Sequence, residues 1–377
     1  MPSSSSIDAQ HIAHAQQLAS DARLVTDPNP RVGCVLVAPS GEVIGSGHTQ
    51  RAGGPHAEVM ALRDAAERGL SVAGATAYVT LEPCAHHGRT GPCCDALVAA
   101  GIGRVVASIT DPNPRVAGQG FARLRAAGVA VEIGPGAEAT RELNIGFFSR
   151  MVRKTPWVRL KTAASLDGKT ALSNGVSQWI TSAEARTDGH AWRARASAVL
   201  TGVGTVIDDD PRLDVRLVET PRQPHLVIVD SRLQTPPGAR LFDVPGRQVW
   251  IYAARPDADR AAALTARGAT IVSLPNADGK VDLGAMLHDL ARREVNELHV
   301  EAGHKLNGSL LREGWVDELL VYLAPKLIGE GLEMASQPFA GGPLTALTGA
   351  LPLEFRSVER FGPDLRIVAR VAGRDAF

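Results

Sequence analysis

Apolar and polar positions alternate along the first 150 residues in a way that predicts short strands separated by helices. Apolar runs at 32–38, 75–81 and 104–110 are strand-like, whereas apolar positions at 7–23 and 56–68 recur at helical spacing. Further expected elements are strands at 43–48 and 129–133 and helices at 95–100, 117–127 and 137–148. Such alternation is typical of a layered α/β domain with a mixed or parallel sheet.

A second alternation of the same kind follows a basic segment at 149–156, which lacks clear periodicity and ends at a proline. Domain boundaries fall in segments of this type, and 377 residues suit two domains, so we predict domains at 1–150 and 151–377. The elements expected in the second domain lie at 157–163, 183–196, 198–201, 225–229, 248–252, 270–274, 297–300 and 318–324.

Composition narrows the class of protein. Hydrophobic residues make up 44% of the chain and charged residues 21%, as in soluble globular proteins, and 40 Lys and Arg balance 40 Asp and Glu. No overall positive field therefore recruits nucleic acid or an acidic membrane. No apolar run approaches the roughly 18 residues of a membrane span, and the N-terminus lacks the order of a secretory signal. We expect a cytoplasmic protein that acts on a small molecule, not on nucleic acid or a membrane.

One short repeat stands out, because the sequence Thr-Asp-Pro-Asn-Pro-Arg-Val occurs at both 26–32 and 110–116. Turn formation by the Pro-Asn-Pro core explains each copy. The alternative is that one or both turns line a pocket.

The first domain carries a candidate metal site. His56 opens a predicted helix, Cys84 follows a strand, and Cys93 opens another helix. One imidazole and two thiolates suit Zn²⁺ with its fourth position left open, which is a catalytic arrangement. The chain has four cysteines, too few for a disulfide framework at this length, and three of them lie within eleven positions. The cluster therefore indicates metal chemistry in a reducing cytosol, with Cys94 as a competitor of Cys93.

Glu58 adds a chemical role to this metal site. It lies two positions after His56, about 200° around a helix, so it should not bind the same ion. A carboxylate beside an activated water can take up and deliver its proton. His-x-Glu followed by Pro-Cys is the signature of zinc deaminases, although eight residues rather than two separate Cys84 from Cys93.

That longer spacing points to a particular family. The segments at 28–35, 54–58 and 82–97 resemble the deaminase half of the bifunctional riboflavin-biosynthesis deaminase–reductases, which has a cytidine-deaminase-like fold. The resemblance implies zinc held by His56, Cys84 and Cys93, with Glu58 as the catalytic proton carrier. It also implies substrate contacts at Asn29, His86 and Arg89. Gly91 replaces a proline common in the family, and His87, Cys34 and Cys94 are interpreted as structural.

Signals for a nucleotide in the second domain are weak when taken alone. Gly202 and Gly204 follow an apolar strand, but Ile207 stands where a dinucleotide fingerprint has its last glycine. Arg232 after the strand at 226–230 favours a ribose 2′-phosphate, whereas Asp230 favours a free hydroxyl. These residues do not decide between NADP and NAD as the coenzyme.

A resemblance also covers this domain. The segments at 161–169, 177–182, 200–211 and 300–311 look like the reductase half of the same family, which has a dihydrofolate-reductase-like α/β fold and uses NADPH. His304 departs from the small residue or proline common there. The implied cofactor contacts are Ala163, Trp179, Thr205, Asp209, Ser231, Gly303, His304, Lys305, Leu306, Asn307, Gly308 and Ser309. The implied substrate contacts are Lys161, Ser177, Arg193, Leu213, Arg216 and Glu301.

The resemblance implies two reactions on a pyrimidine ribotide. The first is zinc-dependent deamination, and the second is NADPH-dependent reduction of the ribosyl group, with Arg193 and Arg216 on the substrate phosphate. Lys161 is the first candidate for the proton donor of the reduction and Asp209 the second. The family further suggests a dimer through the second domain.

Two other functions compete with this hypothesis. A nucleoside or tRNA deaminase with an accessory nucleotide-binding domain would share the His-Ala-Glu and Pro-Cys motifs, but it should show Cys-x-x-Cys and, for tRNA, a basic face. A zinc module without catalytic activity, attached to a nucleotide-binding scaffold, would keep the metal but release no ammonia.

Overall fold

The computed structural model describes residues 4–86, 91–114 and 116–377, and the chain divides into two compact units, Met1–Arg153 and Lys154–Phe377. Both units have an α/β architecture, which confirms the predicted fold class. None of the helices in the described ranges is long and apolar enough to cross a membrane.

The first unit is built on a mixed five-stranded sheet with the order β2-β1-β3-β4-β5. In this sheet β1 is antiparallel to β2 and β3, whereas β3, β4 and β5 are parallel. The strands are β1 (Gly33–Val37), β2 (Val43–His48), β3 (Thr76–Val79), β4 (Arg104–Ala107) and β5 (Ala130–Ile133). The helices are α1 (Ser4–Asp21), η1 (Ala22–Leu24), α2 (Ala57–Glu67), α3 (Cys93–Ala99), α4 (Gln119–Ala126), α5 (Ala137–Leu143) and α6 (Ile145–Val152).

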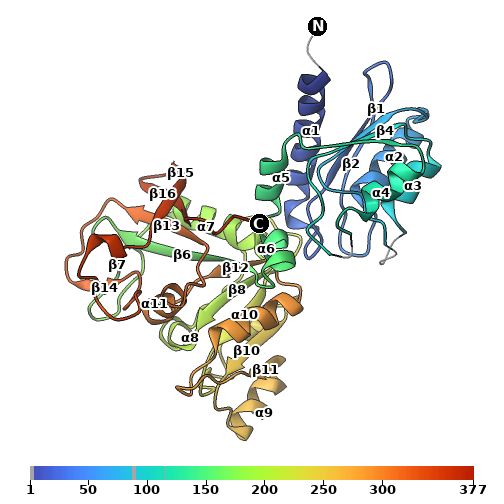
Figure 1. The fold of residues 1–377 in the computed structure, drawn as a ribbon. Coiled ribbons are helices and arrows are strands. Elements are labelled where there is room, and N and C mark those ends of the chain that lie inside the picture. The colour runs from blue at the N-terminus through green and yellow to red at the C-terminus, as the bar shows by residue number, and fades with distance from the viewer. Residues whose placement is uncertain (1–3, 87–90, 115) are drawn as a thin grey trace. The chain divides into compact units, whose positions relative to one another are not determined.

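Glycines let helices approach both faces of this sheet (Figure 1). A Cβ on Gly33 would lie 1.9 Å from the Ala15 carbonyl oxygen of α1, and one on Gly47 would lie 2.5 Å from the Met60 Cβ of α2. Because side chains alternate along a strand, these two contacts lie on opposite faces of the β1–β2 pair. The close fit holds α2, whose first turn follows His56, against the sheet.

The predicted single helix at 137–148 is two helices, so this expectation is wrong. Asn144 separates α5 from α6 with φ −116° and ψ 21°. Its side-chain amide donates to the Arg31 carbonyl at 2.9 Å and accepts from the Arg31 N–H at 2.7 Å. This two-way hydrogen bond to the backbone near β1 stabilises the break, which no periodicity in the sequence reveals.

The second unit contains a nine-stranded sheet with the order β11-β10-β9-β8-β12-β6-β13-β16-β15. Neighbouring strands are parallel from one edge of the sheet, β11, across to β13. Strands β16 and β15 then continue the sheet as an antiparallel hairpin. A separate ribbon pairs β7 with β14. The strands are β6 (Trp157–Ser165), β7 (Lys169–Leu172), β8 (Ala198–Gly202), β9 (His225–Val229), β10 (Val249–Ala253), β11 (Ala269–Ser273), β12 (Glu297–Val300), β13 (Glu318–Ala324), β14 (Gly331–Glu333), β15 (Leu353–Phe361) and β16 (Asp364–Val371).

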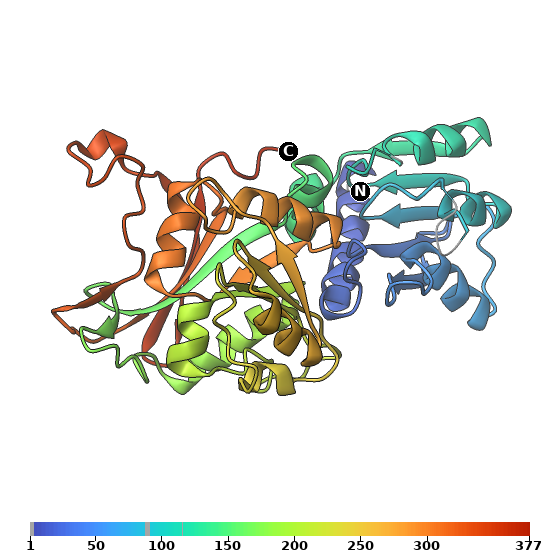
Figure 2. The ribbon, with the colours of Figure 1, turned by 90° about the horizontal axis from the view of Figure 1, so that it is seen from below.

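Helices cover both faces of this second sheet, with α10 and α11 on one face and α7, α8 and α9 on the other (Figure 2). Leu200 and Val300 pack toward α10 and α11, and Val199 and Ile251 pack toward α8 and α9. The helices are α7 (Ala183–Arg195), α8 (Val203–Asp209), η2 (Arg240–Asp243), α9 (Ala258–Ala266), α10 (Leu283–Arg292), α11 (His304–Arg312) and η3 (Leu347–Gly349). Sheets of this kind bind ligands at the carboxyl ends of their parallel strands.

Candidate active sites

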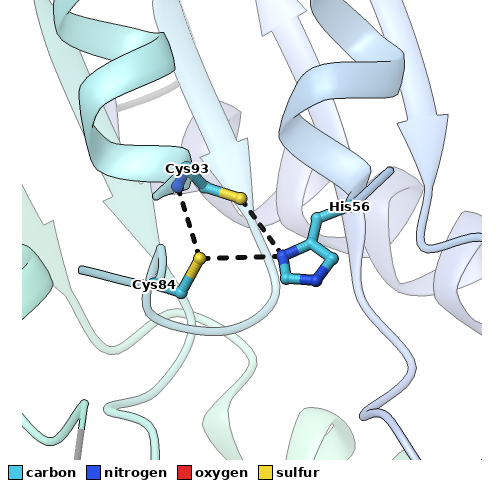
Figure 3. Close-up of side chains that lie close together, drawn as sticks. All are labelled: His56, Cys84 and Cys93. Carbon is cyan, nitrogen blue, oxygen red and sulfur yellow. Dashed lines mark hydrogen bonds between the residues drawn. The ribbon is translucent and has the colours of Figure 1, made fainter. Parts of the chain in front are cut away.

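His56, Cys84 and Cys93 converge in the first unit, as Figure 3 shows. His56 is the residue before α2, Cys84 lies in the segment after β3, and Cys93 is the first residue of α3. Their ligand atoms all lie within 4.8 Å of one another. The His56 Nδ1 atom is 3.6 Å from the Cys84 Sγ and 3.3 Å from the Cys93 Sγ. We call these three residues the His–Cys–Cys triad.

The triad fits a tetrahedral zinc ion. Bonds of about 2.3 Å to sulfur and about 2.0 Å to nitrogen place neighbouring ligand atoms roughly 3.5 Å apart. The two sulfur–nitrogen distances, 3.6 and 3.3 Å, bracket this value. Three soft or borderline donors are also the ligand type that zinc favours over magnesium or calcium.

The two thiols of the triad interact directly. The pKa of Cys84 is lowered to about 4 because the Cys93 thiol donates to it, and His56 and the Cys93 N–H add to this effect. The backbone donor lies 3.3 Å from the Cys84 Sγ. The pKa of Cys93 is raised for the complementary reason. These hydrogen bonds therefore favour the thiolate form of Cys84.

Glu58 lies in the first turn of α2 with only 3% of its surface exposed. Burial raises the pKa of its carboxyl to about 7, and the charge of Cys84 adds to the rise. The Glu58 side chain also forms a hydrogen bond with Cys93. A buried carboxyl therefore stands beside the triad without being one of the three grouped ligands.

The other residues expected at this site are more dispersed. Asn29 is half-buried in the turn before β1, where its N–H donates to the Thr26 carbonyl at 2.9 Å. His86 is exposed two residues after Cys84. Arg89 lies outside the described residues, so its predicted substrate contact stays a prediction. Cys94 is buried outside the triad, and Cys34 is also buried.

Glu82 is a supporting residue that sequence reasoning missed. Its buried carboxylate accepts the N–H groups of Asp111, Gly118 and Gly120 at 3.2, 2.9 and 2.9 Å. Asp111 belongs to the second copy of the repeat, Gly118 is the residue before α4, and Gly120 lies in the first turn of α4. Because Glu82 lies two residues before Cys84, it ties these residues to the segment that positions a triad ligand.

The second unit contains a cavity of about 1170 Å³. It lies at the carboxyl ends of parallel strands, beside the helices that follow β8 and β12. The lining includes the expected cofactor residues Ala163, Trp179, Thr205, Asp209, Ser231, Gly303, His304, Lys305, Leu306 and Asn307. It also includes every substrate residue expected in the second domain, namely Lys161, Ser177, Arg193, Leu213, Arg216 and Glu301.

Gly308 and Ser309 do not line the cavity, although both were expected to contact the cofactor. They lie a full turn into α11, past the end that faces the cavity. A Cβ on Gly308 would lie 1.8 Å from the Ser336 carbonyl oxygen, so this glycine lets a neighbouring segment approach. The Ser309 hydroxyl donates to the Lys305 carbonyl at 3.2 Å.

An ion-paired group forms one wall of the cavity. Glu301 accepts from Arg193 Nε at 2.6 Å and from Arg193 Nη2 at 2.9 Å. Arg193 Nη1 also donates to the Asp214 carbonyl, and Lys161 Nζ lies 3.7 Å from Glu301 Oε2. Arg193 is therefore neutralised, whereas Arg216 is half exposed and, among the residues that the structure describes, pairs only with Asp214.

His299 lies next to Glu301 and was not among the residues predicted for this site. It is completely buried, and neither ring nitrogen has a hydrogen-bond partner among the described residues. Its Nε2 is 3.6 Å from Glu301 Oε1. Burial lowers the pKa of His299 to about 3, so the ring is neutral under physiological conditions.

Two family models match this chain, and each falls within one unit. "Cytidine and deoxycytidylate deaminase zinc-binding region" matches residues 5–109, and "RibD C-terminal domain" matches residues 156–367. The "Riboflavin biosynthesis protein RibD" of Escherichia coli K12 is 45% identical over 371 residues, which cover 95% of this chain and 98% of that protein. This chain belongs to the RibD family. It is thus a bifunctional riboflavin-biosynthesis enzyme, a deaminase and a reductase.

Other RibD proteins are also similar to this chain over nearly its whole length. The RibD of Aquifex aeolicus is 40% identical and covers 96% of this chain and 98% of its own. A solved RibD structure from Acinetobacter baumannii has a TM-score of 0.87 at 38% identity, and covers 98% of this chain and 99% of its own. A Thermotoga maritima structure described as a diaminohydroxyphosphoribosylaminopyrimidine deaminase/5-amino-6-(5-phosphoribosylamino)uracil reductase has a TM-score of 0.85 at 31% identity, with coverage of 98% and 99%. Because these RibD matches span both units, they disfavour a tRNA or nucleoside deaminase with an accessory domain.

Proposed function

We propose that the first unit deaminates 2,5-diamino-6-(5-phosphoribosylamino)pyrimidin-4(3H)-one with zinc bound by the His–Cys–Cys triad. The second unit then reduces the ribosyl side chain with NADPH and yields 5-amino-6-(5-phosphoribitylamino)uracil. The observation that carries this proposal is the buried Glu58 carboxyl next to three zinc-type ligands. A purely structural zinc site does not need a neighbouring acid of this kind.

In the deamination, a C–O bond forms at the ring carbon, the C–N bond breaks, and a proton must reach the departing nitrogen. Zinc, when bound, supplies Lewis-acid activation of a water near neutral pH. Glu58 accepts a proton from the attacking water at a carboxylate oxygen and delivers it to the amino nitrogen. Its position in the first turn of α2 keeps it beside His56 throughout the reaction.

In the reduction, the wall formed by Lys161, Arg193 and Glu301 orients the sugar. NADPH, when bound, supplies the hydride. Glu301 accepts hydrogen bonds from sugar hydroxyls, and Arg216 faces the phosphate because it is the more exposed of the two arginines. Lys161 remains the first candidate for proton donor. Asp209 is the second, and burial raises the pKa of its carboxyl so that it keeps its proton to higher pH.

The setting of these reactions is also part of the proposal. All four cysteines are free, which suits the reducing cytoplasm. We place the contact of a homodimer on β15, an edge strand on which Phe355 is 73% exposed and Val358 54%. Long apolar edge strands need cover. Light scattering on the wild type and on Phe355→Glu tests this contact, and a monomeric wild type contradicts it.

The function is tested with the purified, zinc-loaded protein and the diaminopyrimidine ribotide. We expect ammonia release without NADPH, followed by one equivalent of NADPH oxidised per ammonia when the coenzyme is added. Lys161→Met and Asp209→Asn then distinguish the two proton-donor candidates, because only loss of the true donor abolishes NADPH oxidation while ammonia release persists. Absence of ammonia from this substrate contradicts the assignment of the first unit.

A further inference from the structure

Residues 212–216 form part of the cavity wall without belonging to a helix or a strand. Three of them, Leu213, Asp214 and Val215, are buried. Buried backbone groups need hydrogen-bond partners, which a helix or a strand ordinarily supplies. Among the described residues, no backbone–backbone hydrogen bond reaches these five positions. Side chains from elsewhere in the second unit bind the backbone of this 212–216 segment instead.

Arg247 holds the first part of the 212–216 segment. Its Nη2 donates to the Arg212 carbonyl at 2.8 Å, and its Nη1 donates to the Leu213 carbonyl at 2.6 Å. A further bond from Nη2 goes to the Leu241 carbonyl at 2.7 Å. Burial lowers the pKa of this guanidinium to about 10, because the charge is poorly solvated. The fold thus keeps a costly cation whose described hydrogen bonds all go to backbone carbonyls.

The contact with Arg247 matters most at Leu213, which has φ +48°. This left-handed backbone is unfavourable for a residue other than glycine and persists where the surroundings impose it. The Leu213 side chain is buried in the same cluster as Val206 of α8, and it also lines the cavity. The carbonyl bond from Arg247 and the buried side chain therefore hold Leu213 in place together.

Gln223 and His190 hold the second part of the 212–216 segment. Gln223 Oε1 accepts the Val215 N–H at 2.7 Å, and Gln223 Nε2 donates to the Val215 carbonyl at 2.9 Å. This two-way contact resembles the pairing with a neighbouring strand. His190 of α7 accepts the Arg216 N–H on Nδ1 at 3.2 Å. The backbone that carries the Arg216 guanidinium is thereby fixed beside the cavity.

His190 can accept this hydrogen bond because its ring is neutral. A backbone N–H always donates, so Nδ1 is unprotonated and the ring hydrogen lies on Nε2. Burial lowers the pKa of His190 to about 4, and the nearby charges of Arg193 and Arg216 contribute. Glu301 and Asp214 oppose this change but do not cancel it. The bond to the Arg216 N–H therefore persists at neutral pH.

Helix α7 also joins the 212–216 segment to Glu301. Arg193, three residues after His190, donates to the Asp214 carbonyl through Nη1 and pairs with Glu301 through Nε and Nη2. The Asp214 carboxylate in turn accepts from Arg216 Nη1 at 2.6 Å. A shift of the segment would therefore move the Arg216 guanidinium relative to Glu301.

We propose that His190 and Arg247 are positioning residues for the reduction, because they hold Leu213 and Arg216 where the substrate binds. This inference rests on the proposed contacts of Leu213 and Arg216 with the pyrimidine ribotide. Neither His190 nor Arg247 lines the cavity, so both act through the 212–216 segment. A wall that is ordered before binding loses less conformational freedom when it captures a ligand.

The test measures NADPH oxidation by the full-length protein with the deaminated ribotide, and its inhibition by ribose 5-phosphate. His190→Leu removes the acceptor, and Arg247→Met removes the donors to the carbonyls. Each should raise KM for the ribotide and the inhibition constant of ribose 5-phosphate about 10-fold or more, the effect of misplacing a charge-assisted hydrogen bond. Because the reacting groups remain, kcat should fall less than about threefold. The dissociation constant of NADPH should change less than about twofold.

A rescue variant and a matched control separate positioning from a general effect on stability. In His190→Asn the side-chain oxygen lies near the place of Nδ1 and can accept the same N–H, so KM should stay within about threefold of the wild type. His225→Leu is the control, because His225 Nδ1 accepts the Gln248 N–H at 3.1 Å outside the cavity lining. It loses the same kind of bond in the same unit, and both constants should stay unchanged.

Three results would overturn the inference: unchanged constants in His190→Leu and Arg247→Met, equal impairment of His190→Leu and His190→Asn, or loss of NADPH affinity in parallel with the rise in KM. Thermal melting followed by circular dichroism checks that each variant folds. Should His190→Leu unfold, the KM of Arg247→Met decides. A wild type that oxidises no NADPH with this ribotide contradicts the proposed function of the second unit, whereas an active wild type with unimpaired variants contradicts this inference alone.

Discussion

Arg193 and Glu301 form a bidentate ion pair in one wall of the cavity of the second unit, with N–O distances of 2.6 and 2.9 Å. Both side chains are largely buried, at 10% and 14% exposure. Lys161 adds a second cation at 3.7 Å from the same carboxylate. Glu301 thus compensates two positive charges, and we expect its charge to matter to both the fold and the reaction.

Glu301→Gln should lower the free energy of unfolding of the second unit by about 3–5 kcal/mol, because it leaves a buried cation without its partner. NADPH oxidation should fall at least about 100-fold as the cavity wall rearranges. Ammonia release should persist, because the triad lies in the other unit. Urea unfolding and the two activity assays measure these effects.

The matched control is Glu333→Gln, since the Glu333 carboxylate pairs with Lys169 at 3.6 Å but is 71% exposed. An exposed pair contributes only about 0–1 kcal/mol. A similar loss of stability in both variants would show that burial of the Arg193–Glu301 pair is unimportant.

Glu58→Gln should reduce ammonia release by about 10²–10⁴-fold, the usual contribution of a general acid–base group. Zinc content should stay at one equivalent, because Glu58 is not among the triad ligands. Metal analysis and an ammonia assay on the same sample test both statements. Glu67→Gln, at an exposed position of the same helix, should change neither. Loss of zinc from Glu58→Gln would make this residue structural.

Gly120→Ala should weaken the zinc site from a distance. A Cβ at this position would lie 2.0 Å from the Pro83 carbonyl oxygen, next to Cys84. The resulting shift should break the Gly120 N–H bond to Glu82 and reduce zinc affinity about 10–100-fold, as removal of outer-sphere contacts does elsewhere. Competition with a chromogenic chelator measures this affinity. Gly91→Ala, where a Cβ would meet no described atom within 4 Å, should retain the metal.

His299 should make the second unit less stable in acid. Its pKa is about 3 in the fold and 6.5 ordinarily, so between these values the unfolded chain binds a proton that the folded chain does not. The contribution of the neutral His299 ring to the free energy of unfolding is complete above pH 6.5. It is lost as the pH falls toward 3, at about 1.4 kcal/mol per pH unit. The charged groups that face His299 are Glu301, Arg159, Arg193 and Lys161.

Urea midpoints between pH 4.5 and 7.5 test this prediction. His299→Gln cannot titrate, so its stability should fall less steeply with acid than that of the wild type. Burial also lowers the pKa of His190 to about 4, and this residue adds the same slope to both proteins. If the urea midpoints of the wild type and of His299→Gln fall in parallel as the pH is lowered, the proton-linked role of His299 is ruled out.

Motifs in the sequence predicted the chemical groups well because each motif is local. His-Ala-Glu places Glu58 and His56 on one helix start, and Pro-Cys places Cys84 after β3, so the triad follows from short stretches of chain. Most strands also lie within a few residues of their predicted ranges, because buried apolar runs mark them clearly. The expected family and fold class are confirmed.

Features created by distant contacts could not be predicted. The break at Asn144 depends on Arg31, and the role of Glu82 depends on N–H groups nearly 30 or more positions away. Arg255 and Lys280 line the same cavity because the parallel strands β10 and β11 align their carboxyl ends. The helices α9 and α10 and the hairpin of β15 and β16 were also not predicted from the pattern.

Each set of proposed catalytic side chains comes from one unit: the triad and Glu58 precede residue 94, and the described cavity lining begins at Lys161. A chain break between the units would thus leave the triad with Glu58 on one piece and the described cavity lining on the other. Two genes could encode the halves separately, and each half could be duplicated, lost or recruited to another pathway without rebuilding the other. A single chain also guarantees equal amounts of two enzymes that work in succession.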